Sequence, residues 1–140
     1  MTQYHGKSGA FKLDDTGGSL RDISAYCDEV SIKREVSTAE ATTFGDTARD
    51  YLAGLMDATL SISGKWDDAA TTGVDVVVGE NLVAVATRSF EWGPSGTTTG
   101  RIKYSGECII TSFEITGNFD DVVTFSMEVQ TTGGITRGTW

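Results

Sequence analysis

The stretch Ala58-Thr-Leu-Ser-Ile-Ser-Gly-Lys-Trp66 is the clearest indication of the fold. Apolar residues or glycine occupy every second position, and polar residues occupy the positions between them. Because successive side chains of a β-strand point to opposite faces of its sheet, this alternation predicts a strand with one buried and one exposed face. Residues 30–36 alternate in the same way and predict a second half-buried strand.

Residues 37–57, which connect these two strands, show no clear period. A structureless connection of about twenty residues is unusual in a compact domain, and it usually serves a function or becomes ordered against a partner. The segment contains five large apolar or aromatic residues: Phe44, Tyr51, Leu52, Leu55 and Met56. We predict a long assembly loop that packs on its own domain or on a neighbouring subunit.

Residues 67–79 contain the one predicted helix. Asp67 or Asp68 would cap its start, and an acidic residue there suits the helix dipole. Four apolar residues would share one face of the helix: Ala70, Val74, Val77 and Val78. Because valine is a mediocre helix former, a strand over residues 74–78 is the alternative.

The other segments predict strands and turns. Residues 10–13 and 19–23 would form one hairpin, and residues 82–92 and 101–105 would form another around the Gly-rich loop 93–100. Each of these loops is rich in the residues that favour turns, which supports the hairpin interpretation.

Two final strands are predicted over residues 108–116 and 122–131. The first would carry on one face Ile109, Thr111, Phe113 and Ile115. The second would direct away from the core a polar face made of Thr124, Ser126, Glu128 and Gln130. Because Gly133-Gly134 would end the last strand, we expect a C-terminal arm at residues 133–140, and the polar residues 1–9 predict an N-terminal arm.

Together these segments predict a mainly β fold in one domain over residues 1–140. The expected architecture is an antiparallel β-sandwich or a partly closed barrel, with one short helix and a long inter-strand loop. A chain of 140 residues is long enough to bury a single core without disulfides or metals.

The net charge of −9 restricts the partners of the chain. Proteins that grip nucleic acid do so with Lys and Arg, and anionic membrane surfaces attract the same residues. The charge therefore argues against a nucleic-acid reader and a membrane-bound protein, but not against a protein that lies near DNA without gripping it. Since no apolar run approaches the ~20 residues needed to span a bilayer and no apolar leader is visible, we expect folding in a cytoplasm.

The sequence offers little chemistry for a catalytic or metal site. His5, the single histidine, lies in the predicted arm, where nothing would orient it as a base. Cys27 and Cys108 lack metal-ligand spacing, and two buried, reduced side chains are favoured over a disulfide. The acidic pairs occur at predicted turns or strand ends, where Asp bonds its local backbone: Asp14-Asp15, Asp28-Glu29, Asp67-Asp68 and Asp120-Asp121. We expect no enzyme activity, no cofactor and no metal.

The three tryptophans divide into two groups. Trp66 and Trp92 lie on apolar strand faces, which predicts that they belong to the core. Trp140 is the last residue, and it either packs against a neighbouring subunit or frays into solvent.

Three stretches carry a family resemblance: Val30-Ser-Ile-Lys-Arg-Glu-Val, Thr42-Thr-Phe-Gly-Asp-Thr and Asp57-Ala-Thr-Leu-Ser-Ile-Ser-Gly-Lys-Trp. They are similar to the central block of many phage tail proteins, and Asp120-Asp-Val-Val-Thr-Phe-Ser-Met-Glu-Val-Gln-Thr-Thr-Gly-Gly resembles the end of those proteins. The order of the predicted elements also resembles the tail tube proteins of siphophages, an architecture shared with contractile-tail and type VI secretion tubes.

The resemblance implies a structural subunit of the virion, assembled in the host cytoplasm. Such subunits form hexameric rings that stack into a hollow tail tube, through which DNA passes into the host without specific binding. Residues 37–57 would be the inter-ring loop, and the implied subunit interface contains Phe44, Asp46, Tyr51, Leu55 and Trp140. The implied partners are other copies of the chain and the tail tape-measure, tail-tip and terminator proteins.

The residues agree with this implication in three ways. Ring formation would pair exposed sheet edges, which are otherwise sites of aggregation. The polar face made of Thr124, Ser126, Glu128 and Gln130 would suit a wet lumen. An acidic protein would also repel DNA, so that the genome slides instead of sticking.

Three alternatives remain open at the level of the sequence. The chain could be a tube subunit of a contractile injection system. It could instead be a surface carbohydrate-binding β-sandwich module, which would expose aromatic residues on a concave face and stay monomeric. A small hydrolase would need a converging acid/base pair, and the sequence does not indicate one.

Overall fold

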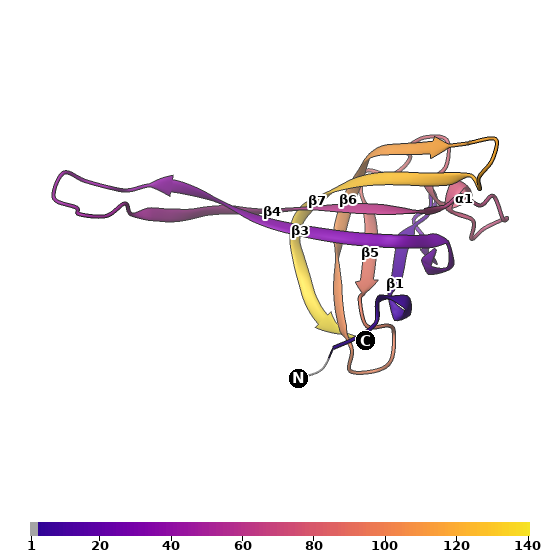
Figure 1. Cartoon of the computed structure of the whole chain (residues 1–140), viewed down its shortest axis with the longest axis horizontal. Helices are drawn as coiled ribbons and strands as arrows, with labels where there is room; N and C mark the ends of the chain where they lie inside the picture. The colour runs from indigo at the N-terminus through magenta and orange to yellow at the C-terminus, as the bar shows by residue number, and fades with distance from the viewer. Residues whose placement is uncertain (1–2) are drawn as a thin grey trace.

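Seven strands form one antiparallel sheet in the computed structural model, which describes residues 3–140 (Figure 1). The strands are β1 (Ala10–Asp14), β2 (Leu20–Asp22), β3 (Cys27–Glu40), β4 (Tyr51–Lys65), β5 (Arg88–Gly93), β6 (Ile102–Thr116) and β7 (Thr124–Thr139). Their order in the sheet is β2-β1-β5-β6-β7-β4-β3. Two short 3-10 helices, η1 (Gly6–Ser8) and η2 (Ser24–Tyr26), precede β1 and β3, and α1 (Val74–Val78) follows β4. The predicted mainly β class is confirmed, and the sheet does not close into a barrel.

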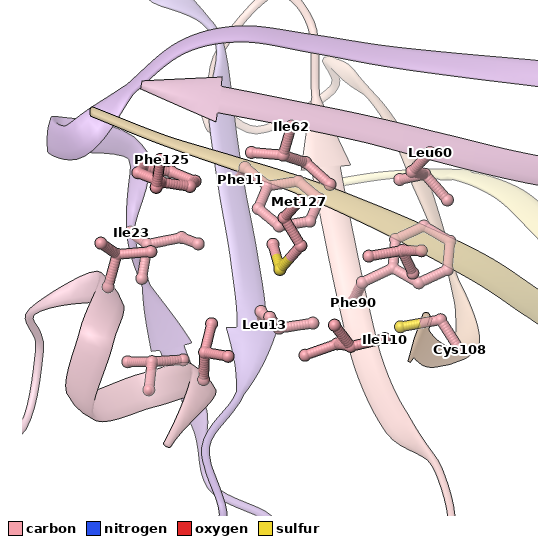
Figure 2. Packing of buried hydrophobic residues seen from close by; sticks show 14 residues of the cluster. Phe11, Leu13, Ile23, Leu60, Ile62, Phe90, Cys108, Ile110, Phe125 and Met127 are labelled. Atoms are coloured by element: carbon pink, nitrogen blue, oxygen red, sulfur yellow. The ribbon is translucent and has the colours of Figure 1, made fainter. Parts of the chain in front are cut away.

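One hydrophobic core lies on one face of this sheet. The sheet curls, so that β1 and β4, which are separated by three strands in the sheet order, contribute to the same cluster. Figure 2 shows side chains of β1, β4, β5, β6 and β7 converging around Met127. The strands predicted from alternation supply this face: Leu60 and Ile62 from β4 and Phe125, Met127 and Val129 from β7 are buried.

The predicted helix forms, but it is shorter than residues 67–79. Three valines of α1 are fully buried against the sheet, namely Val74, Val77 and Val78. The helix begins after Gly73, so neither Asp67 nor Asp68 caps it with a side chain. Asp67 instead organises the preceding loop, because its carboxylate accepts the Ala69 N–H and its carbonyl accepts the Asp75 N–H.

The segment predicted as a long loop, residues 37–57, differs most from expectation. β3 continues to Glu40 and β4 begins at Tyr51, so only residues 41–50 connect them. Figure 1 shows this extension as a two-stranded arm that projects from the rest of the molecule. We call residues 36–56 the β3–β4 arm. Its side chains are exposed on both faces. Because one-sided burial is what produces a period of two, no alternation marks these strands in the sequence.

A β-bulge explains a further difference, in which side chains of β6 face the core. The register of β6 against β7 shifts between Ile110 and Ser112. An extra residue reverses which side chains face the core. Cys108 and Ile110 are therefore buried, while Ile109 and Thr111 of the predicted apolar face are exposed. Beyond the bulge the predicted phase holds, and Phe113 packs against the core.

The chain ends also differ from the predicted arms. Gly133 adopts a φ of +76° near a register shift in the β6–β7 ladder, so the glycines distort the strand without ending it. Residues 133–139 belong to β7, and pairing with β6 resumes at Thr136 opposite Ser105 and continues to Thr139 opposite Ile102. In the N-terminal segment, residues 3–9 are mostly exposed and include η1, and Met1 and Thr2 lie outside the described residues.

Candidate assembly surfaces

The side of the sheet opposite the core is polar and in register across four strands. Ser61 of β4 lies between Ser31 of β3 and Glu128 of β7, and Ser112 of β6 is opposite Glu128. Neighbouring rows repeat the pattern, with Ser63 opposite Ser126 and Thr59 opposite Gln130. We call this surface the polar face. It contains all four predicted lumen residues, of which Ser126 and Glu128 are exposed and Thr124 and Gln130 are half-buried.

Hydrogen bonds within the chain hold several side chains of the polar face. The Ser61 hydroxyl donates to Glu128 Oε1 at 3.0 Å. Gln130 Nε2 donates to the carbonyl of Ala58 at 3.0 Å and also to the Asp57 carboxylate. These bonds cross between β4 and β7 and so link polar side chains of neighbouring strands.

Two lysines of the polar face form ion pairs, whereas two of its glutamates do not within the described residues. Lys33 Nζ lies 2.7 Å from Glu35 Oε1, and Lys65 Nζ lies 3.1 Å from Asp28 Oδ2. The Glu35 carboxylate raises the pKa of the Lys33 ammonium. Among the residues that the structure describes, no ion pair involves the carboxylates of Glu114 or Glu128. Each of these two lysines therefore has a carboxylate partner in the same chain, while Glu114 and Glu128 have no cationic partner among the described residues.

The β3–β4 arm brings together most of the predicted interface residues. Phe44 at its tip is fully exposed, Leu55 is 87% exposed and Tyr51 is 55% exposed. Asp46 shapes the tip, because its carboxylate accepts the Thr43 N–H at 2.7 Å and its own N–H donates to the Thr43 carbonyl. Leu52 and Met56 add further exposed apolar surface to the arm. Several exposed apolar side chains on one projection are typical of protein–protein contact sites.

Trp140, the fifth predicted interface residue, packs against other residues of its own chain. Its N–H donates to the Arg101 carbonyl at 3.0 Å, and its carbonyl accepts the Gly100 N–H. The ammonium groups of Lys12 and Lys103 lie 5.1 and 5.0 Å from its ring centroid, which is cation–π distance. The residue is half-buried and ordered, so the structure does not place it with the arm.

The sequence interpretation missed a second apolar surface, at the turn between β6 and β7. We call residues 117–123 the β6–β7 turn. Phe119 is 100% exposed and Val122 is 57% exposed. Ile115 at the end of β6 and Val123 extend this surface. The signal in the sequence was a phenylalanine between Asn118 and Asp120, where a turn favours polar residues.

The residues considered for catalysis are spread over the chain in structural roles. His5 Nδ1 accepts the Lys7 N–H, and the Asp15 carboxylate accepts the N–H groups of Gly17 and Ser19. The bond from Ser19 is the largest influence that lowers the pKa of Asp15. Burial raises the pKa values of the Cys27 and Cys108 thiols to about 12, so both stay protonated, and both cysteines are free.

The described residues contain no group of three or more His, Cys, Asp and Glu side chains that could hold a metal ion. Over the same residues, no helix is long and apolar enough to cross a membrane.

The family model and the solved structures indicate the same kind of protein. The family model described as phage tail tube protein matches residues 5–137. No curated protein matches the chain in sequence. The tail of an empty gene transfer agent (GTA) particle, which has C6 symmetry, contains a chain that is 21% identical, with 96% of this chain and 98% of that chain covered and a TM-score of 0.73.

Two further structures have a similar chain. The SPP1 tail tube protein is 11% identical, with 99% of this chain and 80% of that chain covered and a TM-score of 0.69. A chain of the sheath–tube complex of an extracellular contractile injection system, PVC, is 10% identical, with 99% and 93% covered and a TM-score of 0.69. At such identities the structural likeness establishes a shared fold.

Proposed function

The chain belongs to the phage tail tube protein family, and from this premise we propose that it forms hexameric rings whose polar faces line the lumen of a stacked, hollow tube. It is a structural subunit of the virion tail. The C6 symmetry of the GTA tail, whose chain has the same fold, supports six subunits in each ring. The polar face is the observation that carries the proposal, because a predominantly polar surface over four strands suits a water-filled channel.

The charge of the polar face suits the passage of DNA without specific binding. Phosphates are held by Lys and Arg that displace counterions. Lys33 and Lys65 are already paired with carboxylates of the same chain, while no ion pair within residues 3–140 includes Glu114 or Glu128. DNA in this lumen therefore meets hydroxyl groups and repulsive carboxylates, and it slides.

The β3–β4 arm carries the contacts between subunits. Phe44, Tyr51 and Leu55 expose apolar surface on a projection that does not cover its own core. Burial of that surface against other copies would supply free energy for assembly. Asp46 keeps the tip in shape, and Trp140 contacts a neighbour only through the part of its ring that Lys12 and Lys103 leave uncovered.

Removal of the arm tests this proposal. A variant in which a two-residue Asn-Gly turn replaces residues 37–55 keeps every residue of the core and joins the paired residues Val36 and Met56 by a favoured turn. We expect the purified full chain to form long hollow tubes in negative-stain electron microscopy at high concentration. The shortened variant should fold with a similar circular dichroism spectrum and form no tubes.

Two results would contradict parts of this proposal. A full chain that stays monomeric at high concentration, with the tail-tip protein present as an initiator, would contradict the tube. Binding of that monomer to a glycan array would then support the carbohydrate-binding module. Tubes from the shortened variant would instead show that the arm is dispensable.

A second candidate is the tube of a contractile injection system, favoured by the likeness to the PVC sheath–tube complex. The two candidates differ in what surrounds the tube, because a contractile tube is enclosed by a sheath. Electron microscopy of native particles containing this chain distinguishes them: a bare tube supports the long-tailed phage, and a sheath layer supports the injection system. The tape-measure and terminator proteins are proposed partners in the first case.

A further inference from the structure

We propose that the β6–β7 turn is a docking surface for the tip of the β3–β4 arm of a second copy of the chain, in the next ring of the tube. The proposal rests on the proposed function, since it needs stacked rings. It adds the surface that receives the arm and its principal residue, Phe119.

The β6–β7 turn presents its apolar residues on a well-fixed backbone. The Asp121 N–H donates to the Asn118 carbonyl at 3.2 Å, and the Asp121 carboxylate accepts the Val122 N–H at 2.8 Å. The Val123 carbonyl accepts the Trp66 N–H at 3.0 Å, which ties the turn to the end of β4. Phe119 is nevertheless 100% exposed. A large aromatic side chain held in water by an ordered turn indicates a contact site.

The β6–β7 turn and the arm lie at opposite ends of the same strands. In the β4–β7 ladder, Lys65 pairs with Thr124 and Thr59 pairs with Gln130. The turn therefore lies beyond the Lys65 end of β4, and the arm extends beyond the Thr59 end. Figure 1 shows the arm at one end of the long axis and the loop between β6 and β7 at the other.

This arrangement matches the geometry of a stacked barrel. Strands in a barrel are tilted, but each one still runs from one rim to the other. If the polar face lines the lumen, the arm reaches one rim of the ring and the β6–β7 turn lies at the opposite rim. Rings that stack in one direction bring these two different rims together. Such a head-to-tail contact repeats without limit, as a long tube requires.

The two surfaces are also complementary in chemistry. Each has one fully exposed phenylalanine, Phe44 in the arm tip and Phe119 in the turn, and aromatic pairs are favourable contacts. Asp120 follows Phe119, and Arg49 lies in the arm tip. The nearest carboxylate to Arg49 is that of Glu40, at 3.9 Å between exposed side chains, which is a weak pair. Arg49 is therefore free to meet Asp120 of the neighbouring copy.

Substitution of Phe119 tests the docking surface. Phe119→Ser removes the aromatic ring from a fully exposed position, so the fold and melting temperature should stay unchanged. We expect the concentration needed for tube growth to rise about tenfold or more, as for the loss of an interface hot spot. Val83→Ser is the matched control, because Val83 is 70% exposed in a different loop, and it should assemble as the original chain does.

Cross-linking gives a second, geometric readout. The native thiols are protonated at neutral pH and react poorly, so introduced cysteines should dominate disulfide formation. The double variant Gly45→Cys, Asn118→Cys places them beside Phe44 and Phe119 and keeps both aromatic rings, at positions where a side chain has room. After mild oxidation of tubes, we expect a ladder of covalent oligomers on a denaturing gel. Either single variant should give dimers at most, since each copy then has one reactive thiol.

The outcomes separate this inference from the function on which it rests. Tubes from the original chain together with normal tube growth of Phe119→Ser would overturn the docking surface and leave the tube function intact. Tubes of the double cysteine variant that yield no ladder would do the same. An original chain that forms no tubes at all would contradict the proposed function, and the docking surface with it.

Discussion

At the scale of single residues, Arg88 is the most unusual feature of the core, because it is charged and only 1% exposed. Its Nη1 donates to the Val77 carbonyl and its Nη2 to the Val78 carbonyl, both at 2.9 Å. These carbonyls end α1, where a helix leaves its last C=O groups without partners. Burial lowers the pKa of the Arg88 guanidinium. The residue therefore holds α1 on the sheet at the cost of a desolvated charge.

We expect Arg88→Met to lower the free energy of unfolding by about 3 kcal/mol, because it leaves buried carbonyls unpaired. Arg88→Lys should be nearly as destabilising, since an ammonium cannot reproduce the planar fork of donors. Urea unfolding monitored by tryptophan fluorescence measures both. Arg49→Met, at an exposed site, is the control and should change stability by less than about 0.5 kcal/mol. An unchanged midpoint for Arg88→Met would show that the carbonyls find other partners.

Arg88 also shows why the structural role of some residues cannot be predicted from the sequence. Its partners are backbone carbonyls, which every residue carries, so no neighbouring side chain marks the site. The position lay within the predicted strand 82–92, whereas β5 begins only at Arg88 and ends at Gly93. Trp140 is a similar case: the two lysines over its ring are distant in sequence and become neighbours only when β1, β5 and β6 pair.

At the scale of elements, the success of the sequence prediction depended on one-sided burial. β4 was predicted over residues 58–66, where it covers the core, and was missed over residues 51–57, where both faces are exposed. The ladder continues there because its backbone hydrogen bonds do not need a buried face. The β3–β4 register also shifts between Val36 and Thr38, which interrupts any alternation in the arm. Exposed hairpins and bulges are therefore the elements that alternation cannot predict.

The same argument predicts how the arm behaves before assembly. Amide hydrogens in the arm should exchange with solvent quickly in dilute, unassembled protein, because little buried apolar surface protects this ladder. In tubes the exchange should slow by about tenfold or more, once neighbouring copies cover the arm. Hydrogen–deuterium exchange with mass spectrometry measures both states. Residues 58–65 of β4 are the internal control and should be protected in each. An arm that is equally protected in both states would mean that assembly does not cover it.

At the scale of the whole molecule, the polar side of β7 could be predicted from the sequence. Its polar residues alternate along the strand with Phe125, Met127 and Val129, which are buried. The extension of this face over β3, β4 and β6 depends on strand order and register, which alternation within a single strand does not reveal. This register decides where a charge would meet DNA. Glu128 lies on the polar face beside Ser61, while Glu80 is exposed in the loop that follows α1.

Charge reversal at these two glutamates tests whether the polar face lines the lumen. Glu128→Lys and Glu80→Lys change the net charge of the chain equally, so their difference reports position alone. Tubes of the original chain should not retain short DNA duplexes. Tubes of Glu128→Lys should retain them, and the retention should weaken steeply as salt increases, because six new lysines per proposed ring would release counterions from the duplex. Sedimentation of tubes with labelled DNA gives the bound fraction. Retention by Glu80→Lys equal to that by Glu128→Lys would mean that the polar face is not the surface that DNA meets, and the lumen would then have to be sought on another face of the sheet.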